Sequence, residues 1–456
     1  MSVPILEDRA GDEAIEAPNY DNAFDAVVVG AGLAGSAAAL TMAKRGLEVL
    51  LIERGTSPGA KNVFGGVLYT PTIRELADLE NAPLERYVAE RRYAMLTHDD
   101  ETAVSLSPGE WNREPHNDSY TVLRGDFDEW FAEQAVEAGV TLVTETTVTG
   151  VIREGGGIVG VETDRPDGEI RAPYVVLAEG ANSLVGEGAN LKPKESRENV
   201  AVAAKEVLEF PGKNEVLEDR FRLIGDAGAA YHYFGEGAIG EAFGGGFIYT
   251  NGDTVSVGVA YRLEDAAANE QSPEETLNLF KSHPAVAPLL RGARTVEYSA
   301  KTIPEGGAES VPELAHDGAV IVGDAAGLVL NNGVHLEGTN MAVESGYHAG
   351  AAIAEASERG RTGAEALRRY PDALERSFVV KNLERYAWLQ ETVEEDRELL
   401  FETLPRAFAD AGAEYFRMDR KPKEYHAKEA KHTVLEAVGG WSGAAKLALR
   451  YRKMVK

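Results

Sequence analysis

The feature that most constrains this chain is a glycine-rich turn placed directly after a short apolar run. Residues 24–29 read FDAVVV, which is typical of a buried parallel strand. The turn at 30–35 reads GAGLAG, and an Ala-rich helix is expected from there to about Arg45, ended by Gly46. A second strand is expected over 48–52, and Glu53 stands at its end, eighteen residues after Gly35.

This order of strand, turn, helix and acid is typical of a dinucleotide-binding unit. Gly30 permits the tight turn, and Gly32 lets backbone N–H groups approach a pyrophosphate at the helix N-terminus. Gly35 allows the helix to pack closely on the strand, and Glu53 can accept hydrogen bonds from an adenosine ribose. A glycine-rich turn without a ligand is the alternative, and the motif alone does not separate NAD from FAD.

Two later motifs favour FAD. Arg124 lies just ahead of a helix that is expected to open near Asp126, with Asp126 and Glu129 as a pair resembling a capping box. Residues 323–327 read GDAAG and follow a buried strand over 319–322. Asp324 at such a strand end can hold a ribitol hydroxyl while the next N–H groups reach a phosphate. A surface arginine and a polar turn are the alternatives for these two motifs.

The composition excludes several classes of function. The chain has 456 residues, of which 44% are hydrophobic, so general disorder is excluded. Lys and Arg number 46 against 75 Asp and Glu, a net charge of −29 that argues against a nucleic-acid partner. Arg outnumbers Lys by 30 to 16, and an acidic, Lys-poor chain is what a high-salt cytoplasm favours, so we interpret the protein as halophilic.

The chain contains no cysteine, which excludes disulfides, thiolate zinc, a catalytic cysteine and a Cys-ligated iron–sulfur cluster within it. The nine histidines show no metal-ligand spacing, so no metal site is expected. No run reaches the ~18 apolar residues that a membrane span needs. The first 23 residues are acidic and lack an apolar stretch, so we expect a disordered tail rather than a signal peptide.

The rest of the chain is expected to contain both helices and strands. We expect a helix over 70–90, a loop over 107–119, strands within 140–152, 158–163 and 173–178, β-rich segments at 200–210 and 244–261, a helix over 338–357, and helices from 366 onward. This predicts an α/β fold in which a β-rich cap is inserted into a Rossmann-like FAD-binding domain, with a helical C-terminal region. The predicted boundaries are 24–69, 118–185 and 300–365 for the FAD-binding domain, 70–117 and 186–299 for the cap, and 366–456 for the helical region.

Three further segments carry a specific resemblance. They read PGAKNVFGGVLY at 58–69, GGGFIYTN at 244–251, and GLVLNNGVHLEG at 327–338. The earlier motifs resemble the FAD-binding domain of p-hydroxybenzoate-hydroxylase-type flavoproteins. Together with these segments, the chain resembles the FixC branch of the electron-transfer-flavoprotein:quinone oxidoreductase family over about 24–400. Unlike aromatic hydroxylases, it reads EGANS at 179–183 and has no Pro after GDAAG.

The resemblance implies an extended FAD whose ring lies under the cap. The residues implied for the adenosine and pyrophosphate are Gly30, Gly32, Leu33, Ala34, Gly35, Glu53 and Arg54, with Arg124 and Val148 near the ribose and adenine. Those implied along the isoalloxazine and ribitol are Lys61, Asn62, Gly65, Gly66, Gly323, Asp324, Gly327, Gly338, Thr339 and Asn340. The turn into the 338–357 helix would point N–H dipoles at the flavin.

No side chain is assigned as catalytic, because the flavin carries the electrons. His335 in the flavin-proximal loop is a candidate for a proton role, and His232 is a candidate to face a quinone headgroup. Tyr249 is a further candidate without an assigned role. An ordered, hydrogen-bonding histidine and a packing Tyr-His-Tyr segment are the alternatives.

The implied function is electron transfer from a two-subunit electron-transfer flavoprotein (FixA/FixB-like) to a membrane quinone. A separate ferredoxin-like FixX would hold the iron–sulfur cluster that this Cys-free chain cannot. One alternative is a prenyl reductase similar to geranylgeranyl reductases of archaeal-type lipids. Another is a non-catalytic dinucleotide-fold protein similar to Rab escort proteins.

The C-terminal residues reverse the sign of the charge. Residues 421–456 carry nine Lys or Arg and three Glu. A helix on an anionic membrane surface and a docking site for an acidic ferredoxin, with Trp388, Phe401 and Trp441 as apolar contacts, both fit this pattern, and a solvated helix is the alternative. The expected location is the cytoplasm, with a peripheral position on the inner face of the cell membrane as the variant that the basic tail allows.

Overall fold

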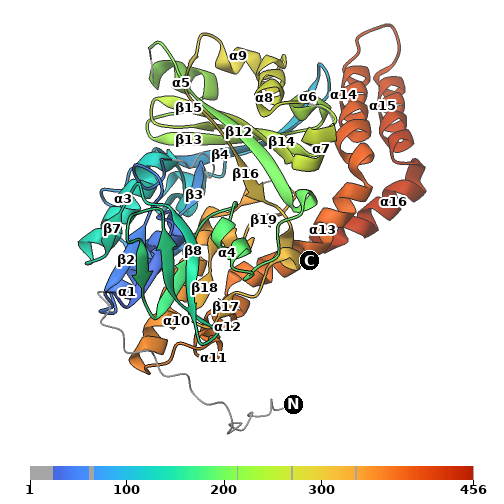
Figure 1. Ribbon diagram of the computed structural model, residues 1–456. Coiled ribbons are helices and arrows are strands. Elements are labelled where there is room, and N and C mark those ends of the chain that lie inside the picture. Colours follow the sequence, from blue (N-terminus) through green and yellow to red (C-terminus); the bar gives the residue numbers. More distant parts are fainter. Residues whose placement is uncertain (1–23, 61–65, 213, 269–270, 334–335, 455–456) are drawn as a thin grey trace.

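A computed structural model of the chain describes residues 24–60, 66–212, 214–268, 271–333 and 336–454. The architecture is mixed α/β, with two large sheets joined by helices and a helical C-terminal region beside them (Figure 1). The predicted fold class is confirmed by this arrangement of elements.

The first sheet is the core of the nucleotide-binding part. Its strand order is β17-β18-β11-β1-β2-β7, and its pairs are parallel apart from the β17–β18 pair. The bounds are β1 (Ala26–Val29), β2 (Val49–Ile52), β7 (Thr141–Val143), β11 (Tyr174–Leu177), β17 (Ala315–His316) and β18 (Ala319–Ile321). Strands β1, β2 and β11 are buried at every position, because helices cover the sheet and leave no polar face.

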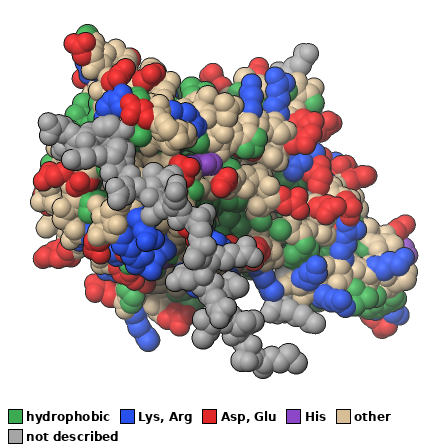
Figure 2. All heavy atoms as spheres, turned by 60° about the horizontal axis from the view of Figure 1, so that its bottom comes forward, with side chains coloured by type: hydrophobic (Ala, Val, Ile, Leu, Met, Phe, Trp, Pro, Cys, Tyr) green, Lys and Arg blue, Asp and Glu red, His purple; other side chains and the backbone are tan. Residues whose placement is uncertain are grey.

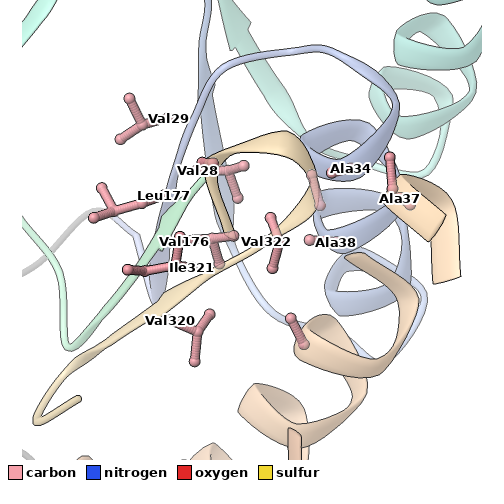
Figure 3. Close-up of a cluster of buried hydrophobic side chains, with 14 of the residues drawn as sticks. Val28, Val29, Ala34, Ala37, Ala38, Val176, Leu177, Val320, Ile321 and Val322 are labelled. Carbon is pink, nitrogen blue, oxygen red and sulfur yellow. The ribbon is translucent and has the colours of Figure 1, made fainter. Parts of the chain in front are cut away.

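Helix α1 (Leu33–Ala43) packs against both α10 (Thr339–Glu358) and α3 (Arg124–Glu137). Figure 3 shows valines of the sheet meeting the alanines of α1, with α10 on the other side of that helix. The backbones of α1 and α10 lie in close contact. A Cβ on Gly346 would lie 2.1 Å from the carbonyl oxygen of Ala34, and a Cβ on Gly350 would lie 2.6 Å from the carbonyl oxygen of Ala38. Small residues therefore decide how near the two helices come.

The second sheet has nine strands and lies above the first in Figure 1. Its order is β16-β12-β15-β14-β13-β4-β6-β3, with β5 paired to β4, and the β13–β4 pair is parallel. The bounds are β3 (Val67–Tyr69), β4 (Arg86–Leu96), β5 (Glu101–Leu106), β6 (Ser119–Thr121), β12 (Val200–Glu209), β13 (Ala227–Phe234), β14 (Gly244–Thr250), β15 (Thr254–Arg262) and β16 (Arg294–Pro304). Helices α5 (Asn214–Phe221), α6 (Glu236–Ile239) and α8 (Pro273–Ser282) pack on it and close a second core.

Two local predictions are wrong. The helix expected over 70–90 is limited to α2 (Pro71–Leu76), and residues from Arg86 join β4, because pairing with β13 overrides the local helix signal. Helix α3 begins at Arg124, two residues before the expected opening, and Leu123 at its N-cap makes no side-chain capping bond. Asp126 therefore lies inside the first turn and does not cap the helix.

The remaining elements are short or C-terminal. A three-stranded antiparallel sheet is formed by β8 (Val148–Glu154), β9 (Gly157–Thr163) and β10 (Glu169–Arg171), and β19 (Leu330–Asn331) pairs with β20 (Leu336–Glu337). The short helices are η1 (Gly109–Asn112), η2 (His116–Asp118), α4 (Leu184–Gly188), η3 (Arg197–Asn199), α7 (Leu263–Ala268), α9 (Ala287–Leu290), η4 (Gly307–Ser310) and η5 (Gly323–Ala326). The C-terminal region holds α11 (Ala364–Leu367), α12 (Arg369–Arg376), α13 (Phe378–Glu395), the π-helix η6 (Leu399–Thr403), α14 (Leu404–Tyr415), α15 (Lys423–Ala437), α16 (Gly440–Arg450) and η7 (Tyr451–Met454).

A buried histidine joins α14 to α15. His426 contacts Glu414 at 2.8 Å and Asp419 at 3.0 Å, and its side chain is 2% exposed. The hydrogen bond to Glu414 is the largest cause that raises the pKa of His426, so the imidazolium is favoured between the two carboxylates. Among the described helices, none combines the length and the apolar character that crossing a bilayer requires.

Acidic side chains are spread over the face of the molecule drawn in Figure 2, with lysines and arginines among them. This distribution agrees with the net charge of −29. Neither the surface nor the fold tests the halophilic interpretation, which stays a prediction.

We predict that Gly346→Ala destabilises the protein, because its Cβ would have to displace the backbone of α1 at Ala34. Overpacking of this kind costs about 1–3 kcal/mol, seen as a lower midpoint in urea unfolding. Gly412→Ala in α14 is the matched control, since open space surrounds its Cβ and the change should stabilise the helix by about 0.5–1 kcal/mol. Equal midpoints for Gly346→Ala and the wild type would contradict the prediction.

Candidate functional site

A cleft lies along the carboxyl ends of the parallel strands, the position where open α/β sheets bind ligands. It encloses about 1700 Å³, including the solvent at its mouth. Many of the predicted residues line it together, although they come from distant parts of the sequence. These are Gly30, Gly32, Leu33, Ala34, Glu53, Arg54, Arg124, Val148, Asp324, Gly338 and Thr339.

The glycine-rich turn is forced by close contacts. Gly30 has φ +100° and its N–H donates to the Ile52 carbonyl at 2.7 Å, while a Cβ there would lie 2.4 Å from the Ala178 oxygen. A Cβ on Gly35 would lie 1.8 Å from the Gly30 oxygen. The carbonyl of Gly32 accepts the Ser36 N–H at 2.9 Å, the first helical bond of α1. The N–H groups of the first turn of α1 therefore have no acceptor within the helix, and such free donors suit an anion in the cleft.

Glu53 is held in place by backbone donors. Its Oε2 accepts the Ala31 N–H at 3.0 Å and its Oε1 accepts the Gly55 N–H at 2.6 Å. Each carboxylate oxygen keeps lone-pair capacity for a further donor, such as a ribose hydroxyl.

Arg124 belongs to a buried ion pair that sequence reasoning missed. Its guanidinium donates to both oxygens of Asp128, at 2.7 and 2.8 Å, and the two side chains are 9% and 0% exposed. Gly59 packs on the same turn of α3, where a Cβ would lie 2.7 Å from the Asp128 Cβ. The i, i+4 spacing of Arg124 and Asp128 was the available signal. The pair holds the guanidinium at the cleft wall in one orientation.

Asp324 has a lysine neighbour that the sequence did not indicate. Lys301 of β16 also lines the cleft, with its Nζ 4.0 Å from Asp324 Oδ2. Burial lowers the pKa of Lys301, and Asp324 opposes that shift. Gly323 has φ +61° and a Cβ on it would lie 2.8 Å from the Cβ of Ala34, so the GDAAG turn sits directly against α1.

The segment 179–183 forms another wall. Glu179 accepts the N–H groups of Val185 and Gly186 at 2.7 and 2.9 Å, and burial raises its pKa. Ser183 has φ +38°, and its buried hydroxyl has no hydrogen-bond partner among the described residues. A buried hydroxyl in the wall of a cleft is a group that a bound ligand would satisfy.

The start of α10 closes the far side. The Asn340 amide donates to Glu337 Oε2 at 2.9 Å, while its buried Oδ1 accepts no hydrogen bond from the described residues. The predicted residues Gly35, Gly323, Gly327 and Asn340 are not among those that line the cleft. Lys61, Asn62, Gly65 and His335 lie outside the described residues.

A second cavity, which we call the cap cavity, lies under the nine-stranded sheet and encloses about 1170 Å³. Leu336 lines both spaces, so the cap cavity adjoins the cleft. The predicted residues Gly66, His232 and Tyr249 line it. Five polar residues that the sequence did not single out line it as well: Tyr69, Arg91, Lys205, Glu305 and Asn331.

The predicted residues His232 and Tyr249 belong to one aromatic cluster at this cavity. His232 stacks on Tyr93 with ring centres 5.4 Å apart and meets the edge of Tyr249 at 5.6 Å. Arg91 donates to the Tyr69 hydroxyl at 3.3 Å, and burial raises the pKa of Tyr69. Burial also raises the pKa of Tyr249, so both phenols stay protonated.

Another part of the cap cavity is apolar. Phe243, Leu389, Val393 and Phe401 line it and pack together, and Phe401 meets Phe243 edge to face at 5.6 Å. Phe401 lies in the π-helix η6 and faces the cavity. Phe401 is half-buried and Trp441 is 69% exposed, and their contact with a partner protein stays a prediction.

Comparison with known families matches almost the whole described chain. A family described as "FAD dependent oxidoreductase" matches residues 25–189, and a second one with the same description matches 124–356. The "ETF-QO/FixC family C-terminal domain" matches residues 389–456, which includes Val393 and Phe401 of the cap cavity.

Curated relatives cover most of the chain. The chain is 41% identical over 437 residues to Protein FixC of Azorhizobium caulinodans, covering 95% of this chain and 99% of that protein. It is 42% identical over 434 residues to Protein FixC of Bradyrhizobium diazoefficiens (94% and 98% covered). It is 40% identical over 410 residues to the probable electron transfer flavoprotein-quinone oxidoreductase YdiS of Escherichia coli (89% and 93% covered).

Solved structures share the fold at low identity. A geranylgeranyl bacteriochlorophyll reductase-like protein from Thermoplasma acidophilum superposes with a TM-score of 0.69 at 20% identity, over 95% of this chain and 97% of that one. The halogenase PltM in complex with phloroglucinol and FAD gives a TM-score of 0.58 at 15% identity, over 92% and 84%. The cofactor is FAD, which supplies the electron-transfer chemistry when bound, and the individual FAD contacts of this chain stay predictions.

We predict that Arg124→Ala and Asp324→Ala each weaken FAD binding, because each removes a charged group at the cleft wall. The loss of a charge-assisted contact should cost about 1.5–3 kcal/mol, or roughly 10- to 150-fold in the Kd for FAD. Flavin occupancy after dialysis measures the effect. Arg74→Ala, an exposed arginine paired with Asp118, is the control and should retain FAD like the wild type. Full occupancy in the two cleft variants would show the assignment to be wrong.

Proposed function

Because this chain belongs to the ETF-QO/FixC family of FAD-dependent oxidoreductases, we propose that it accepts electrons from an electron transfer flavoprotein and delivers them to a quinone. That the protein is an FAD-dependent oxidoreductase follows from the family. The donor and the acceptor are the proposed part. The name of the Escherichia coli relative, an electron transfer flavoprotein-quinone oxidoreductase, supports both.

The observation that carries the proposal is the two-sided lining of the cap cavity. Polar groups of Arg91, Lys205, His232 and Tyr249 line one part, and the cluster of Phe243, Leu389, Val393 and Phe401 lines another. A prenyl quinone has the matching chemistry, with carbonyl oxygens on its ring and an apolar tail. The apolar cluster would bind the tail through burial, and the polar groups would face the ring.

A shared wall supports electron transfer between the two spaces. Leu336 lines both the cleft and the cap cavity, and Gly66 in the cap cavity is among the residues implied along the isoalloxazine. Gly66 also packs closely on Tyr249, since a Cβ there would lie 2.8 Å from the ring. A flavin in the cleft would thus have its ring beside the quinone-sized space.

We further propose separate protein partners. A FixA/FixB-like electron transfer flavoprotein is the donor, and a ferredoxin-like FixX carries the iron–sulfur cluster. The argument for FixX is that the chain has no cysteine, and thiolates hold such clusters. Among the described residues, no three His, Asp or Glu side chains gather into a metal-binding group.

The C-terminal helices α15 and α16 are the proposed docking region, on a ferredoxin or on the inner face of the cell membrane. Lys431 lies 5.0 Å from the centre of the exposed Trp441 ring, and Lys423 lies 4.4 Å from that of Tyr415. Cations beside exposed aromatic rings suit either an acidic protein surface or an anionic lipid surface.

A prenyl reductase remains the alternative function. The fold shared with the geranylgeranyl reductase-like protein and the apolar part of the cavity both allow a prenyl chain as the reacting group. Hydrogenation of prenyl double bonds by the reduced protein, with no turnover of a quinone ring, would favour this alternative.

We predict that affinity rises with the length of the quinone tail. Each buried methylene contributes about 0.8 kcal/mol, or roughly fourfold in Kd, until the apolar part is filled. Val393→Asn should weaken a decyl quinone and leave a tail-free quinone unchanged, because Val393 belongs to the apolar cluster. Val104→Asn is the control, since Val104 is 61% exposed on β5 and both Kd values should match those of the wild type. Equilibrium dialysis measures the Kd, and a tail-independent Kd would overturn the proposed acceptor.

We predict that the isolated chain holds FAD and no iron. The reason is the absence of thiolate ligands. Iron analysis of the purified chain, and of each protein that co-purifies with it from the native host, measures this. The expected result is iron in a small co-purifying ferredoxin alone. Stoichiometric iron in this chain would refute the proposed division of cofactors, while leaving the FAD assignment intact.

A further inference from the structure

The cap cavity contains a buried lysine that the proposed function has not used. Lys205 lies on the inner strand β12, is 3% exposed and lines the cavity. It stands in one register row across the sheet, paired with Gly258, which pairs with Phe247, which pairs with His232. Residues directly opposite each other share a face of a sheet, so this row forms one strip of the cavity wall.

Other buried basic residues of this chain have hydrogen-bond partners. Arg86 donates to the carbonyls of Asn251, Gly225 and Gly252, and Lys192 donates to the Ala325 carbonyl at 2.9 Å. Lys205 makes no hydrogen bond or ion pair with any residue in the described part of the chain. An ammonium group on a buried side chain is unfavourable without such partners. Stability of the fold therefore does not account for a lysine at position 205.

The charges around Lys205 do not supply a partner. Burial is the largest influence and lowers its pKa, with Glu297 opposing the shift and Arg124 adding to it. A second lysine, Lys301, lies on the neighbouring strand β16 opposite Ala203 and lines the adjoining cleft. Two lysines from adjacent strands thus face the two spaces, in a chain that is acidic overall.

The neighbours of Lys205 give the cavity an aromatic wall. Gly258 has no side chain, and Phe247 occupies the space above it, since a Cβ on Gly258 would lie 2.3 Å from the Phe247 ring. Phe247 in turn stacks on Tyr249 with ring centres 4.7 Å apart. The lysine therefore borders an aromatic wall, which suits an aromatic or quinonoid ring whose oxygen reaches the ammonium.

We propose that the Lys205 ammonium donates a hydrogen bond to a ring carbonyl oxygen of the acceptor bound in the cap cavity. This inference rests on the proposed function, in which that acceptor is a quinone. Lys205 is then the residue that distinguishes a carbonyl-bearing ring from an apolar ring of the same size. A charged donor would be left unsatisfied by a ligand without that oxygen, which gives discrimination between the two.

The test compares two probes on the FAD-loaded full chain by equilibrium dialysis. One probe is a decyl-substituted benzoquinone, and the other is decylbenzene, which has a six-membered ring and the same tail but no carbonyl. The wild type should prefer the quinone. Lys205→Met should lose about tenfold in quinone affinity and should bind decylbenzene at least as well as the wild type, because the donor that decylbenzene leaves unsatisfied is gone. Lys205→Arg should keep part of the preference, because it keeps a cationic donor. Lys194→Met, at an exposed lysine, controls for the lost charge and should behave as wild type.

Thermal unfolding without a probe separates ligand binding from a structural role. If Lys205 serves a ligand, Lys205→Met should melt at the wild-type temperature or above it, because a buried charge has been removed. A lower melting temperature in both Lys205→Met and Lys205→Gln would show that the lysine supports the fold and would overturn the proposal. An unchanged quinone preference in Lys205→Met would also overturn it and leave the proposed function standing. A wild type that binds both probes equally would overturn the proposed acceptor itself.

Discussion

The close packing of α1 against α10, on the parallel sheet, is the contact on which the rest of the structure depends. A Cβ on Gly346 or Gly350 of α10 would lie 2.1 or 2.6 Å from carbonyl oxygens of α1, so only glycine permits this approach. Gly323 brings the GDAAG turn against the same helix. The N-termini of α1 and α10 therefore border one cleft, and two sets of backbone donors can serve one extended ligand. A single added methyl group at this crossing would separate them.

The basic residues that line the cleft and the cap cavity contrast with the negative net charge of the chain. The chain carries a net charge of −29, yet Arg124, Lys301 and Lys205 are all turned inward along the cleft and the cap cavity. Arg124 is neutralised by Asp128, and Lys301 lies beside Asp324. Lys205 differs from both, since no carboxylate lies within ion-pairing distance of it in the described chain. An acidic surface combined with an inward-facing set of cations suits a phosphate-bearing cofactor and an oxygen-bearing acceptor.

The cap cavity is assembled from segments that are far apart in the chain. Gly66, His232, Tyr249 and Glu305 meet there with Leu389 and Phe401 of the C-terminal region. Burial raises the pKa of Glu305, and the amide of Asn331 donates to it at 2.7 Å. The region matched by the ETF-QO/FixC C-terminal domain begins at residue 389, so the family's C-terminal part completes the cavity wall. The apolar side of the cavity is therefore formed in part by α13 and η6 of the C-terminal region.

The sequence by itself determined the α/β class, the glycine turn, the Glu53 and GDAAG motifs and the family, because each depends on residues close together in the chain. Local pattern also sufficed for the α10 helix, which was expected over 338–357 and is found over Thr339–Glu358. The local pattern gave a wrong prediction at residues 86–90, where a helix was expected, because parallel pairing with β13 outweighs helix propensity. Only the tertiary structure decided that Asp128 holds Arg124, that Phe401 faces inward and that Lys205 lies in the cavity, because the packing of distant strands and helices sets side-chain burial and partners.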